Sequence, residues 1–456
     1  MGATADVFKA YDIRGTVPDQ LDAAMCRAIG GAMARYARAP RLLVARDMRT
    51  SGLELASAFA DGARAEGTTV VDLGLASTDC LYFASGKLDA PAAMFTASHN
   101  PAMYNGVKLC LAGAKPIGRD TGLGDIEAMT NELLAHPTEG TDVAPLEHRD
   151  VLADFAEHVR SFVDVGSLRP LTVVADTANG MGGLVVPLVM GPLPFDLHVL
   201  FGELDGSFPN HPADPIQPEN LLDLKAAVVE RGADVGLAFD GDADRVFLVD
   251  ERAEPVSGSL TTALVAVSML GKHPGATILY NCICSHAVPE AIEEHGGVGV
   301  RTRVGHSFIK QLMAETGAVF GGEHSGHYYF RDNYRADSGI ITALIVLELL
   351  SRSAKPLSEL LAPYRRYADS GEINTEVPDP AAAVEAVAAL EEAAGWGIDR
   401  LDGITVDHGD WWYNLRPSNT EPLLRLNVEA PDPVSCERHV AEVLDLVSAT
   451  RAAPSR

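Results

Sequence analysis

The chain has 456 residues, more than a single hydrophobic core supports, so we expect roughly three domains or more with clefts between them. Apolar residues make up 47% and charged residues 22%, which is typical of a chain that folds throughout and excludes a disordered or fibrous protein. The net charge of -27 repels nucleic-acid phosphates and anionic lipids, so we expect neither nucleic acid nor membrane as a partner. A phosphate site here would need locally clustered basic residues.

Cysteine usage and apolar runs indicate a cytoplasmic protein. The six cysteines are scattered without CxxC spacing, and Cys282 and Cys284 form the only close pair, as expected of buried thiols in a reducing compartment. The N-terminus carries no apolar signal core, and the longest apolar run, around Ile340 to Leu350, is shorter than the ~20 residues that span a bilayer.

Apolar, β-rich runs alternate with helical patterns along most of the chain. The first strand is predicted over Arg41–Asp47 and is followed by a helix over Leu53–Ala65. Similar openings recur from Leu171 and from Ala276, and this alternation predicts three related α/β units with parallel strands. The polar stretch 136–148 is predicted to be a linker.

The C-terminal part differs in kind. An Ala- and Glu-rich helix is predicted from Pro380 to Ala394, with strands on either side and a closing helix, which is typical of an α+β module. We therefore expect four domains, and their predicted bounds are 1–145, 146–250, 251–367 and 368–456.

The segment DGDADR, Asp240 to Arg245, places three carboxylates at alternate positions between two apolar strands. On an extended loop this spacing points all three the same way, and such convergence favours a bound hard cation such as Mg²⁺ or Ca²⁺. An EF-hand loop is excluded because Arg245 stands where that loop needs glycine and because strands flank it. A solvated acidic turn is the simpler alternative.

The segment TASHNP, Thr96 to Pro101, places Ser98 on a tight loop between two strands. The serine alone is typical of a turn, and no GxSxG motif surrounds it. His99 and Lys108 lie close enough in sequence to steady a phosphate on Ser98, which favours a functional role.

Three further segments combine cationic and polar side chains. RPSNTEP, from Arg416, has the components of a phosphate cradle, with a plain turn as the alternative. GEHSGH, from Gly322, has a chemistry that suits sugar hydroxyls, and its HxxH pair is weak as a zinc site. VGHSFIK offers His306 and Lys310 as basic contacts. NGMGG, from Asn179, lacks the third glycine of a dinucleotide site.

Together with KAYDIRG, Lys9 to Gly15, these loops occur in an order that resembles the α-D-phosphohexomutase superfamily over nearly the whole chain. The resemblance implies three related α/β domains with mixed sheets and a C-terminal α+β domain around a central cleft. It also implies an isomerase that acts on hexose phosphates through a phosphoserine and a hexose 1,6-bisphosphate, which serves as activator, and we expect a monomer or homodimer.

The resemblance also implies a role for each matching residue. Mg²⁺ would be bound by Ser98, Asp240, Asp242 and Asp244. The catalytic residues would be Ser98, His99, Lys108, Arg14, Arg245 and His327, and those that bind substrate would be Tyr11, His306, Glu323, Ser325, Arg416, Ser418, Asn419 and Thr420. The general acid/base is either His327 or the pair of Lys108 and His99, and the sequence does not choose between them.

His324 is the main clue to the substrate, because a histidine in the sugar loop resembles bacterial phosphomannomutases. We therefore expect interconversion of mannose 6-phosphate and mannose 1-phosphate, with phosphoglucomutase, phosphoglucosamine mutase and sugar-phosphate phosphatase as alternatives. Ile283 occupies a position where many relatives carry Lys or Arg, which leaves the choice of hexose open. A sensor without catalytic activity would lack the nucleophile or a metal acid, and this chain lacks neither.

Overall fold

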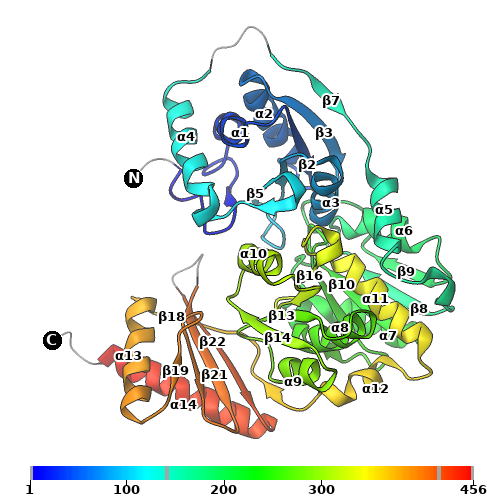
Figure 1. Cartoon of the computed structure of the whole chain (residues 1–456), viewed down its shortest axis with the longest axis vertical. Coiled ribbons are helices and arrows are strands. Elements are labelled where there is room, and N and C mark those ends of the chain that lie inside the picture. The colour runs from blue at the N-terminus through cyan, green and yellow to red at the C-terminus, as the bar shows by residue number, and fades with distance from the viewer. Residues whose placement is uncertain (1–3, 139–142, 419–422, 453–456) are drawn as a thin grey trace.

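The computed structural model describes residues 4–138, 143–418 and 423–452, which form four sheets in succession along the chain. In Figure 1 the first sheet and its helices lie at the top, the second and third at the lower right, and the fourth at the lower left. The first three sheets are mixed and carry helices, and the fourth is antiparallel. The predicted fold class is confirmed.

The first sheet has the order β1-β5-β4-β2-β3-β7, with β6 paired to β5. Its central strand β2 carries four consecutive buried residues, the pattern of a strand covered on both faces. The strands are β1 (Ile13–Thr16), β2 (Arg41–Arg46), β3 (Thr69–Leu75), β4 (Ala92–Phe95), β5 (Tyr104–Leu111), β6 (Lys115–Pro116) and β7 (Leu146–His148), and the helices are α1 (Ala23–Ala37), α2 (Gly52–Ala65), α3 (Thr78–Leu88) and α4 (Leu123–Ala135).

The second sheet has the order β12-β11-β10-β8-β9 and the third the order β14-β13-β15-β16. The second comprises β8 (Thr172–Asp176), β9 (Asp196–Leu200), β10 (Val235–Phe239), β11 (Val246–Val249) and β12 (Pro255–Val256), with α5 (Leu152–Arg160), α6 (Gly182–Met190) and α7 (Leu222–Arg231). The third comprises β13 (Thr277–Asn281), β14 (Val298–Thr302), β15 (Phe320–Gly322) and β16 (Tyr328–Phe330), with α8 (Gly258–Lys272), α9 (Ala287–Glu294), α10 (His306–Thr316), α11 (Gly339–Arg352) and α12 (Leu357–Leu361).

The fourth sheet has the order β17-β22-β21-β20-β19, with β18 paired to β22. It comprises β17 (Ala368–Asp369), β18 (Ile373–Glu376), β19 (Ile398–Asp399), β20 (Ile404–Asp407), β21 (Trp412–Pro417) and β22 (Leu423–Ala430), with α13 (Pro380–Ala393) and α14 (Pro433–Ala452). Pro380 begins α13, where its missing N–H is not needed, and the preceding Asp379 caps the helix by accepting from Ala382 N.

One structural position recurs in the first three sheets. In each sheet, a strand at the end of the parallel set, β4, β10 or β15, is followed in the chain by an antiparallel partner, β5, β11 or β16. Each connecting loop holds one predicted functional motif: the Ser98 loop (96–101), the acidic loop (240–245) and the sugar loop (322–327). Because the carboxyl ends of parallel strands share one edge of a sheet, the repeated topology presents three chemical loops in equivalent places.

The hydrophobic core is continuous across the first three sheets. Phe83 on α3, Phe155 on α5 and Phe330 on β16 belong to one cluster of buried side chains, whereas the fourth sheet has a core of its own. The first three units are therefore packed as one body.

Three smaller expectations can be compared with the structure. The predicted linker 136–148 contains β7, which pairs parallel with β3 through Val70 and Leu146, so the prediction of a linker is wrong for its last residues. All six cysteines are free and buried. In the described part of the chain, no helix has both the length and the apolarity to cross a bilayer.

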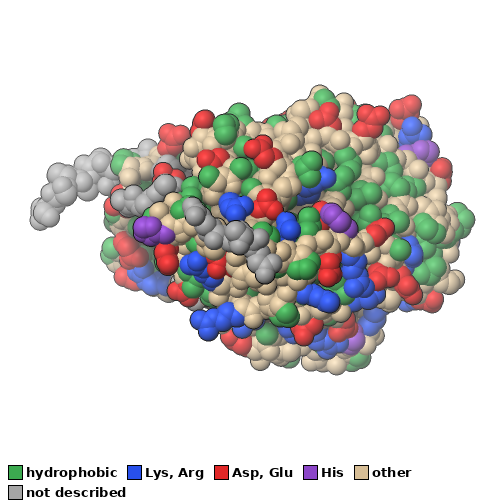
Figure 2. All heavy atoms as spheres, turned by 90° about the horizontal axis from the view of Figure 1, so that it is seen from above, with side chains coloured by type: hydrophobic (Ala, Val, Ile, Leu, Met, Phe, Trp, Pro, Cys, Tyr) green, Lys and Arg blue, Asp and Glu red, His purple; other side chains and the backbone are tan. Residues whose placement is uncertain are grey.

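Acidic side chains are spread over the face shown in Figure 2, intermixed with Lys and Arg.

Candidate active site

The Ser98 loop joins β4 to β5 and holds its serine in an unusual conformation. Ser98 has φ of 50°, in the left-handed region that side chains other than glycine seldom adopt. Its Oγ donates to Asp240 Oδ2 at 2.7 Å, and Arg245 Nη2 lies 3.4 Å from the same Oγ. Ser98 is 3% exposed. The hydroxyl therefore contacts the acidic loop of the second sheet directly.

The acidic loop is a tight turn, so the expectation of an extended loop is wrong. Ala243 has φ of 60°, which reverses the chain between Asp242 and Asp244. One oxygen from each of Asp240, Asp242 and Asp244 lies within 4.8 Å of the other two, and all three residues are buried. The carboxylates thus converge through the turn and not through strand-like alternation.

The donor set of these carboxylates suits a hard divalent cation. Asp242 Oδ1 and Asp244 Oδ1 are buried and, among the described residues, accept no hydrogen bond. Buried carboxylate oxygens left without a donor are costly unless a cation binds them, and an all-oxygen ligand set suits a hard divalent cation. The three aspartates therefore fit a bound metal ion, and Ser98 Oγ lies 2.7 Å from one of their oxygens.

Lys108 neutralises part of this cluster from strand β5. Its Nζ donates to Asp242 Oδ2 at 2.7 Å and to Asp244 Oδ2 at 2.6 Å. Burial disfavours the charge of Lys108, but the two carboxylates outweigh it and raise the pKa well above its usual value. Burial raises the pKa of Asp240 to about 8 despite Arg245, whereas in Asp242 burial is outweighed by Lys108, which lowers the pKa.

Two more cationic or potentially cationic residues surround Ser98. Arg14 Nη1 donates to Asn100 Oδ1 of the Ser98 loop at 2.5 Å and its guanidinium pairs with Asp12. His99 Nδ1 lies 3.4 Å from Ser98 Oγ. Burial lowers the pKa of His99 well below its usual value, and Arg245 and Arg14 lower it further, so we expect a neutral imidazole near pH 7.

The sugar loop is a hairpin turn between β15 and β16. Glu323 N donates to His327 O at 3.0 Å, and Gly326 has φ of 84°. The Glu323 carboxylate is 2% exposed and already accepts from Asn281, Gly305 N and Tyr329.

The side chain of His327 is more accessible than that of Glu323. Its side chain is 22% exposed, with Nε2 3.6 Å from Asp244 Oδ1. Ser325 Oγ lies 3.1 Å from His327 Nδ1 and fixes the ring. A backbone bridge joins Arg245 to His327, so the acidic loop and the sugar loop are in contact.

Tyr11 links the first domain to the third, and its hydroxyl donates to Val304 O at 3.2 Å. Burial raises the pKa of Tyr11 to about 12, Asp402 adds to the rise and Arg416 opposes it, which puts both residues of the fourth domain near this hydroxyl. His306 begins α10, but its side chain lies outside the described part of the structure. Lys310 is buried, pairing with Asp337 at 2.8 Å.

The predicted phosphate loop is only partly described. Arg416 on β21 is 3% exposed, and its guanidinium contacts Asn414, Asn427 and Glu372. Ser418 N donates to Leu423 O across the hairpin at 2.8 Å. Asn419 and Thr420 lie outside the described residues. The structure therefore brings no described residue of this loop into hydrogen-bond contact with Ser98, the acidic loop or the sugar loop.

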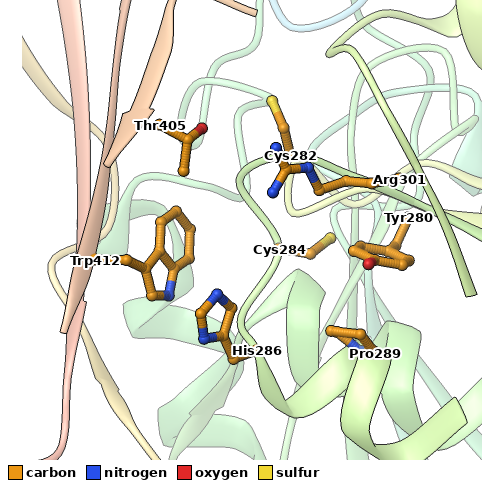
Figure 3. A pocket seen from close by; sticks show the side chains of 8 residues that line it. All are labelled: Tyr280, Cys282, Cys284, His286, Pro289, Arg301, Thr405 and Trp412. Carbon is orange, nitrogen blue, oxygen red and sulfur yellow. The ribbon is translucent and has the colours of Figure 1, made fainter. Parts of the chain in front are cut away.

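Two small cavities lie between the third and fourth domains, and Trp412 lines both of them. The first, of about 90 Å³, is shown in Figure 3, where His286 and Trp412 face each other with stacked rings 5.1 Å apart. The second is lined by His324 and Ile283 from the third domain and by Asn427 from the fourth. His324 and Ile283, the two positions that bear on the choice of hexose, therefore face the fourth domain.

Sequence reasoning missed Arg49, Asp47, Thr78 and Ser259. Arg49 and Asp47 support the Ser98 loop, Thr78 Oγ1 donates to Asp242 at 2.5 Å, and Ser259 Oγ lies 3.0 Å from His324 Nδ1. The signal for Asp47 and Arg49 was their position directly after the buried strand β2, on the edge of the sheet that holds Ser98. The other two are neutral hydroxyls on helices and carried no signal.

Comparisons with known proteins match this arrangement along the whole chain. Models of the phosphoglucomutase/phosphomannomutase family match in four parts: alpha/beta/alpha domain I at residues 5–135, domain II at 153–254, domain III at 257–367 and the C-terminal domain at 372–446.

Three relatives illustrate the similarity. The phosphohexose mutases of Xanthomonas campestris pv. campestris are 41% identical over 448 residues, covering 97% of this chain and 99% of theirs. A phosphomannomutase of Escherichia coli is 37% identical, covering 96% and 98%. The crystal structure of a phosphoglucomutase/phosphomannomutase family protein from Burkholderia thailandensis has a TM-score of 0.88 at 32% identity, covering 99% of this chain and 98% of its own.

Family models that tile the four domains in order, and relatives that align from end to end, agree with the three chemical loops at equivalent sheet edges. The chain belongs to the phosphoglucomutase/phosphomannomutase family and is a phosphohexomutase, an isomerase that transfers a phosphoryl group within its substrate.

Proposed function

We propose that the chain interconverts mannose 6-phosphate and mannose 1-phosphate, with Ser98 carrying the phosphoryl group. The observation that carries the proposal is the 2.7 Å contact between Ser98 Oγ and Asp240 Oδ2, which joins the nucleophile to the acidic loop. Relatives known as phosphomannomutases and His324 in the sugar loop support mannose as the hexose.

In the proposed reaction, phosphorylated Ser98 donates its phosphoryl group to the free hydroxyl of the bound hexose monophosphate. The P–O bond to Ser98 breaks, a new P–O bond forms to the sugar oxygen, and the hydroxyl proton leaves to a base. The resulting hexose 1,6-bisphosphate turns over in place and returns its other phosphoryl group to Ser98. Added hexose 1,6-bisphosphate would activate the protein by phosphorylating Ser98.

Cationic residues would stabilise the group in transfer, whose charge grows on its oxygens. Arg245 and Lys108 lie within hydrogen-bond distance of Ser98 Oγ or the acidic carboxylates, and Arg14 contacts the Ser98 loop. Asp240, Asp242, Asp244 and Ser98 would bind Mg²⁺, which, when bound, offsets the negative charge of the phosphoryl oxygens. Arg416, Ser418, Asn419 and Thr420 would bind the phosphate that is not reacting.

We assign the general acid/base to His327. Lys108 is held by two carboxylates and its side chain is 9% exposed, whereas His327 is 22% exposed and is oriented by Ser325. A base must reach the sugar hydroxyl, and the more accessible imidazole meets this condition better. Glu323 and Ser325 would contact sugar hydroxyls, with Tyr11 and His306 at the margin of the same site.

The remaining features of the proposal concern the whole molecule. We propose domain bounds of 1–145, 146–250, 251–367 and 368–456, a cytoplasmic location, and a monomer or homodimer as the active form. The bounds rest on the order of the functional loops, and the short strands β7 and β12 lie just past the first two bounds and pair with the preceding sheet. The location rests on the cysteine usage.

The test is the Ser98→Ala variant. We expect kcat to fall by a factor on the order of 10⁴ or more while the melting temperature changes little, because a nucleophile is lost without a cavity. Intact-mass measurement should show a phosphorylated form of the parent protein that is missing from the variant. The matched control is Ser161→Ala, an exposed serine that donates to His158 O, and it should leave both readouts unchanged.

The substrate is tested with mannose 1-phosphate, glucose 1-phosphate and glucosamine 1-phosphate, each with Mg²⁺ and a trace of bisphosphate. The highest kcat/KM should be for mannose 1-phosphate. A clear preference for glucosamine 1-phosphate would refute the assignment of the hexose, and steady release of inorganic phosphate would favour a phosphatase.

A further inference from the structure

Arg49 holds the backbone of the Ser98 loop through every terminal N–H of its guanidinium. Nη2 donates to Ser98 O at 2.8 Å and to Asn100 O at 2.7 Å, and Nη1 donates to Pro101 O at 2.9 Å and Tyr104 O at 2.8 Å. The side chain is 0% exposed. Three carbonyls of the Ser98 loop and that of Tyr104, the first residue of β5, therefore share a single buried cation.

Asp47 completes the arrangement from the same segment. Its Oδ2 lies 3.3 Å from Arg49 Nε, and its Oδ1 accepts from Arg49 N at 2.9 Å. Thr96 Oγ1 accepts from Ser98 N at 2.9 Å. The peptide groups on both sides of Ser98 are thus fixed, the N–H through Thr96 and the carbonyl through Arg49.

This support matches what the nucleophile requires. Ser98 is held at φ of 50°, and a residue other than glycine adopts this region only where its surroundings enforce it. A Cβ at Gly241 of the acidic loop would lie 2.4 Å from Ser98 O, so the two loops pack on the carbonyl that Arg49 holds. A shift of this carbonyl would move Ser98 Oγ away from Asp240.

Residues of the second domain pack against Arg49. The Phe208 ring centroid lies 5.3 Å from Arg49 Cζ, a cation–π distance, and a Cβ at Gly206 would lie 2.6 Å from Arg49 Cα. The segment that carries Gly206 and Phe208 therefore packs directly on Arg49. The residue joins the first and second domains where their two chemical loops meet.

We propose that Arg49 is a positioning residue for phosphoryl transfer: it fixes the strained Ser98 loop so that Oγ faces Asp240, with Asp47 orienting the guanidinium. The inference rests on the proposed role of Ser98. Arg49 contacts the loop's carbonyls, so it acts through Ser98 and not on the substrate. A small misplacement of a nucleophile lowers the rate of the chemical step far more than substrate affinity.

The main test is Arg49→Lys, which keeps the charge but cannot span four carbonyls with one ammonium. We expect kcat for mannose 1-phosphate to fall about 100-fold with KM nearly unchanged. The matched control is Arg35→Lys in the same domain, whose guanidinium pairs with Glu66 at 2.8 Å and is 33% exposed. It should keep the kcat of the parent.

A second variant separates positioning from stability. In Arg49→Ala, guanidinium ion added far below denaturing concentrations should restore part of the lost kcat by filling the space of the missing group. Parent-like kcat in Arg49→Lys would overturn the proposal, as would a loss in Arg49→Ala that guanidinium does not relieve, or failure of both variants to fold. A parent protein without mutase activity or phosphorylated Ser98 would instead refute the proposed function.

Discussion

The two carboxylate oxygens of Asp242, like those of Asp244, have different surroundings. Their Oδ2 atoms accept from Lys108, and their Oδ1 atoms accept no hydrogen bond among the described residues. Removing one partner of a buried ion pair leaves an uncompensated charge and costs about 3–5 kcal/mol. The cluster therefore depends on Lys108 when no divalent ion is bound, and this dependence can be measured.

The variant Lys108→Met should lower the free energy of unfolding by about 3–5 kcal/mol without Mg²⁺, and adding Mg²⁺ should restore much of it. Thermal melts with EDTA and with Mg²⁺ would show a larger shift in the variant than in the parent. We also expect kcat to fall by about 10²–10³. Equal shifts in both proteins would count against a metal ion at these aspartates.

The control is Lys87→Met. Lys87 Nζ also pairs with an aspartate, Asp154, at 2.8 Å, but both side chains are more than two-fifths exposed. Exposed ion pairs contribute little to stability, so this variant should melt like the parent in both buffers.

Side chains whose own functional groups indicate their chemistry were predictable from the sequence. The structure brings Ser98, Asp240, Lys108 and Arg245 together, and their roles in catalysis stay predictions. The alternate spacing of the three aspartates correctly predicted that their carboxylates converge. The predicted extended backbone was wrong, because the chain turns at Ala243. Arg49 was missed since its effect arises from four backbone carbonyls, which the side-chain pattern does not reveal.

At the scale of elements, helices α1 and α2 approach closely enough to exclude side chains at their crossing. A Cβ at Gly30 would lie 1.9 Å from Phe59 O, and one at Gly62 would lie 1.8 Å from Arg27 O. Such overlap with backbone cannot be relieved by a rotamer change. Alanine at either glycine should therefore force the helices apart, at a cost of about 1–3 kcal/mol.

The matched substitution is Gly271→Ala in α8, where no atom lies within 4 Å of the added Cβ. It should stabilise the protein by about 0.4–1 kcal/mol by reducing the entropy of the unfolded chain. Denaturant melts of Gly30→Ala, Gly62→Ala and Gly271→Ala check both signs. A stable Gly62→Ala protein would show that the α1–α2 contact is not tight.

The three parallel-strand openings were predictable because strands covered on both faces are continuous apolar runs. The strand β7 was not, since Leu146 and its neighbours are exposed and pair only with β3 at the edge of the sheet. The order of the domains was predictable from the order of the motif loops in the sequence. The first three of these loops each lie where a parallel strand is followed by an antiparallel one.

At the scale of the molecule, His158 lies where the first three domains meet. On α5 of the second domain, its ring is 4.8 Å from that of Phe83 in the first domain, and its Nε2 is 2.9 Å from Asn333 Oδ1 in the third. Burial lowers the pKa of His158, and the hydrogen bond to Asn333 only partly opposes this. The neutral imidazole is thus the form that the packed domains favour.

This lowered pKa predicts acid sensitivity of the domain junction. The folded protein binds a proton at His158 less readily than the unfolded chain, whose histidine titrates near 6.5. Below that pH the unfolded state binds more protons, so the histidine's share of stability is present above about 6.5 and is lost as pH falls toward the folded pKa. The variant His158→Gln keeps a donor for Asn333 and removes the titration. Melting temperatures of parent and variant from pH 7.5 to 5 should show a shallower fall in the variant. Parallel curves would mean that the junction does not sense this proton.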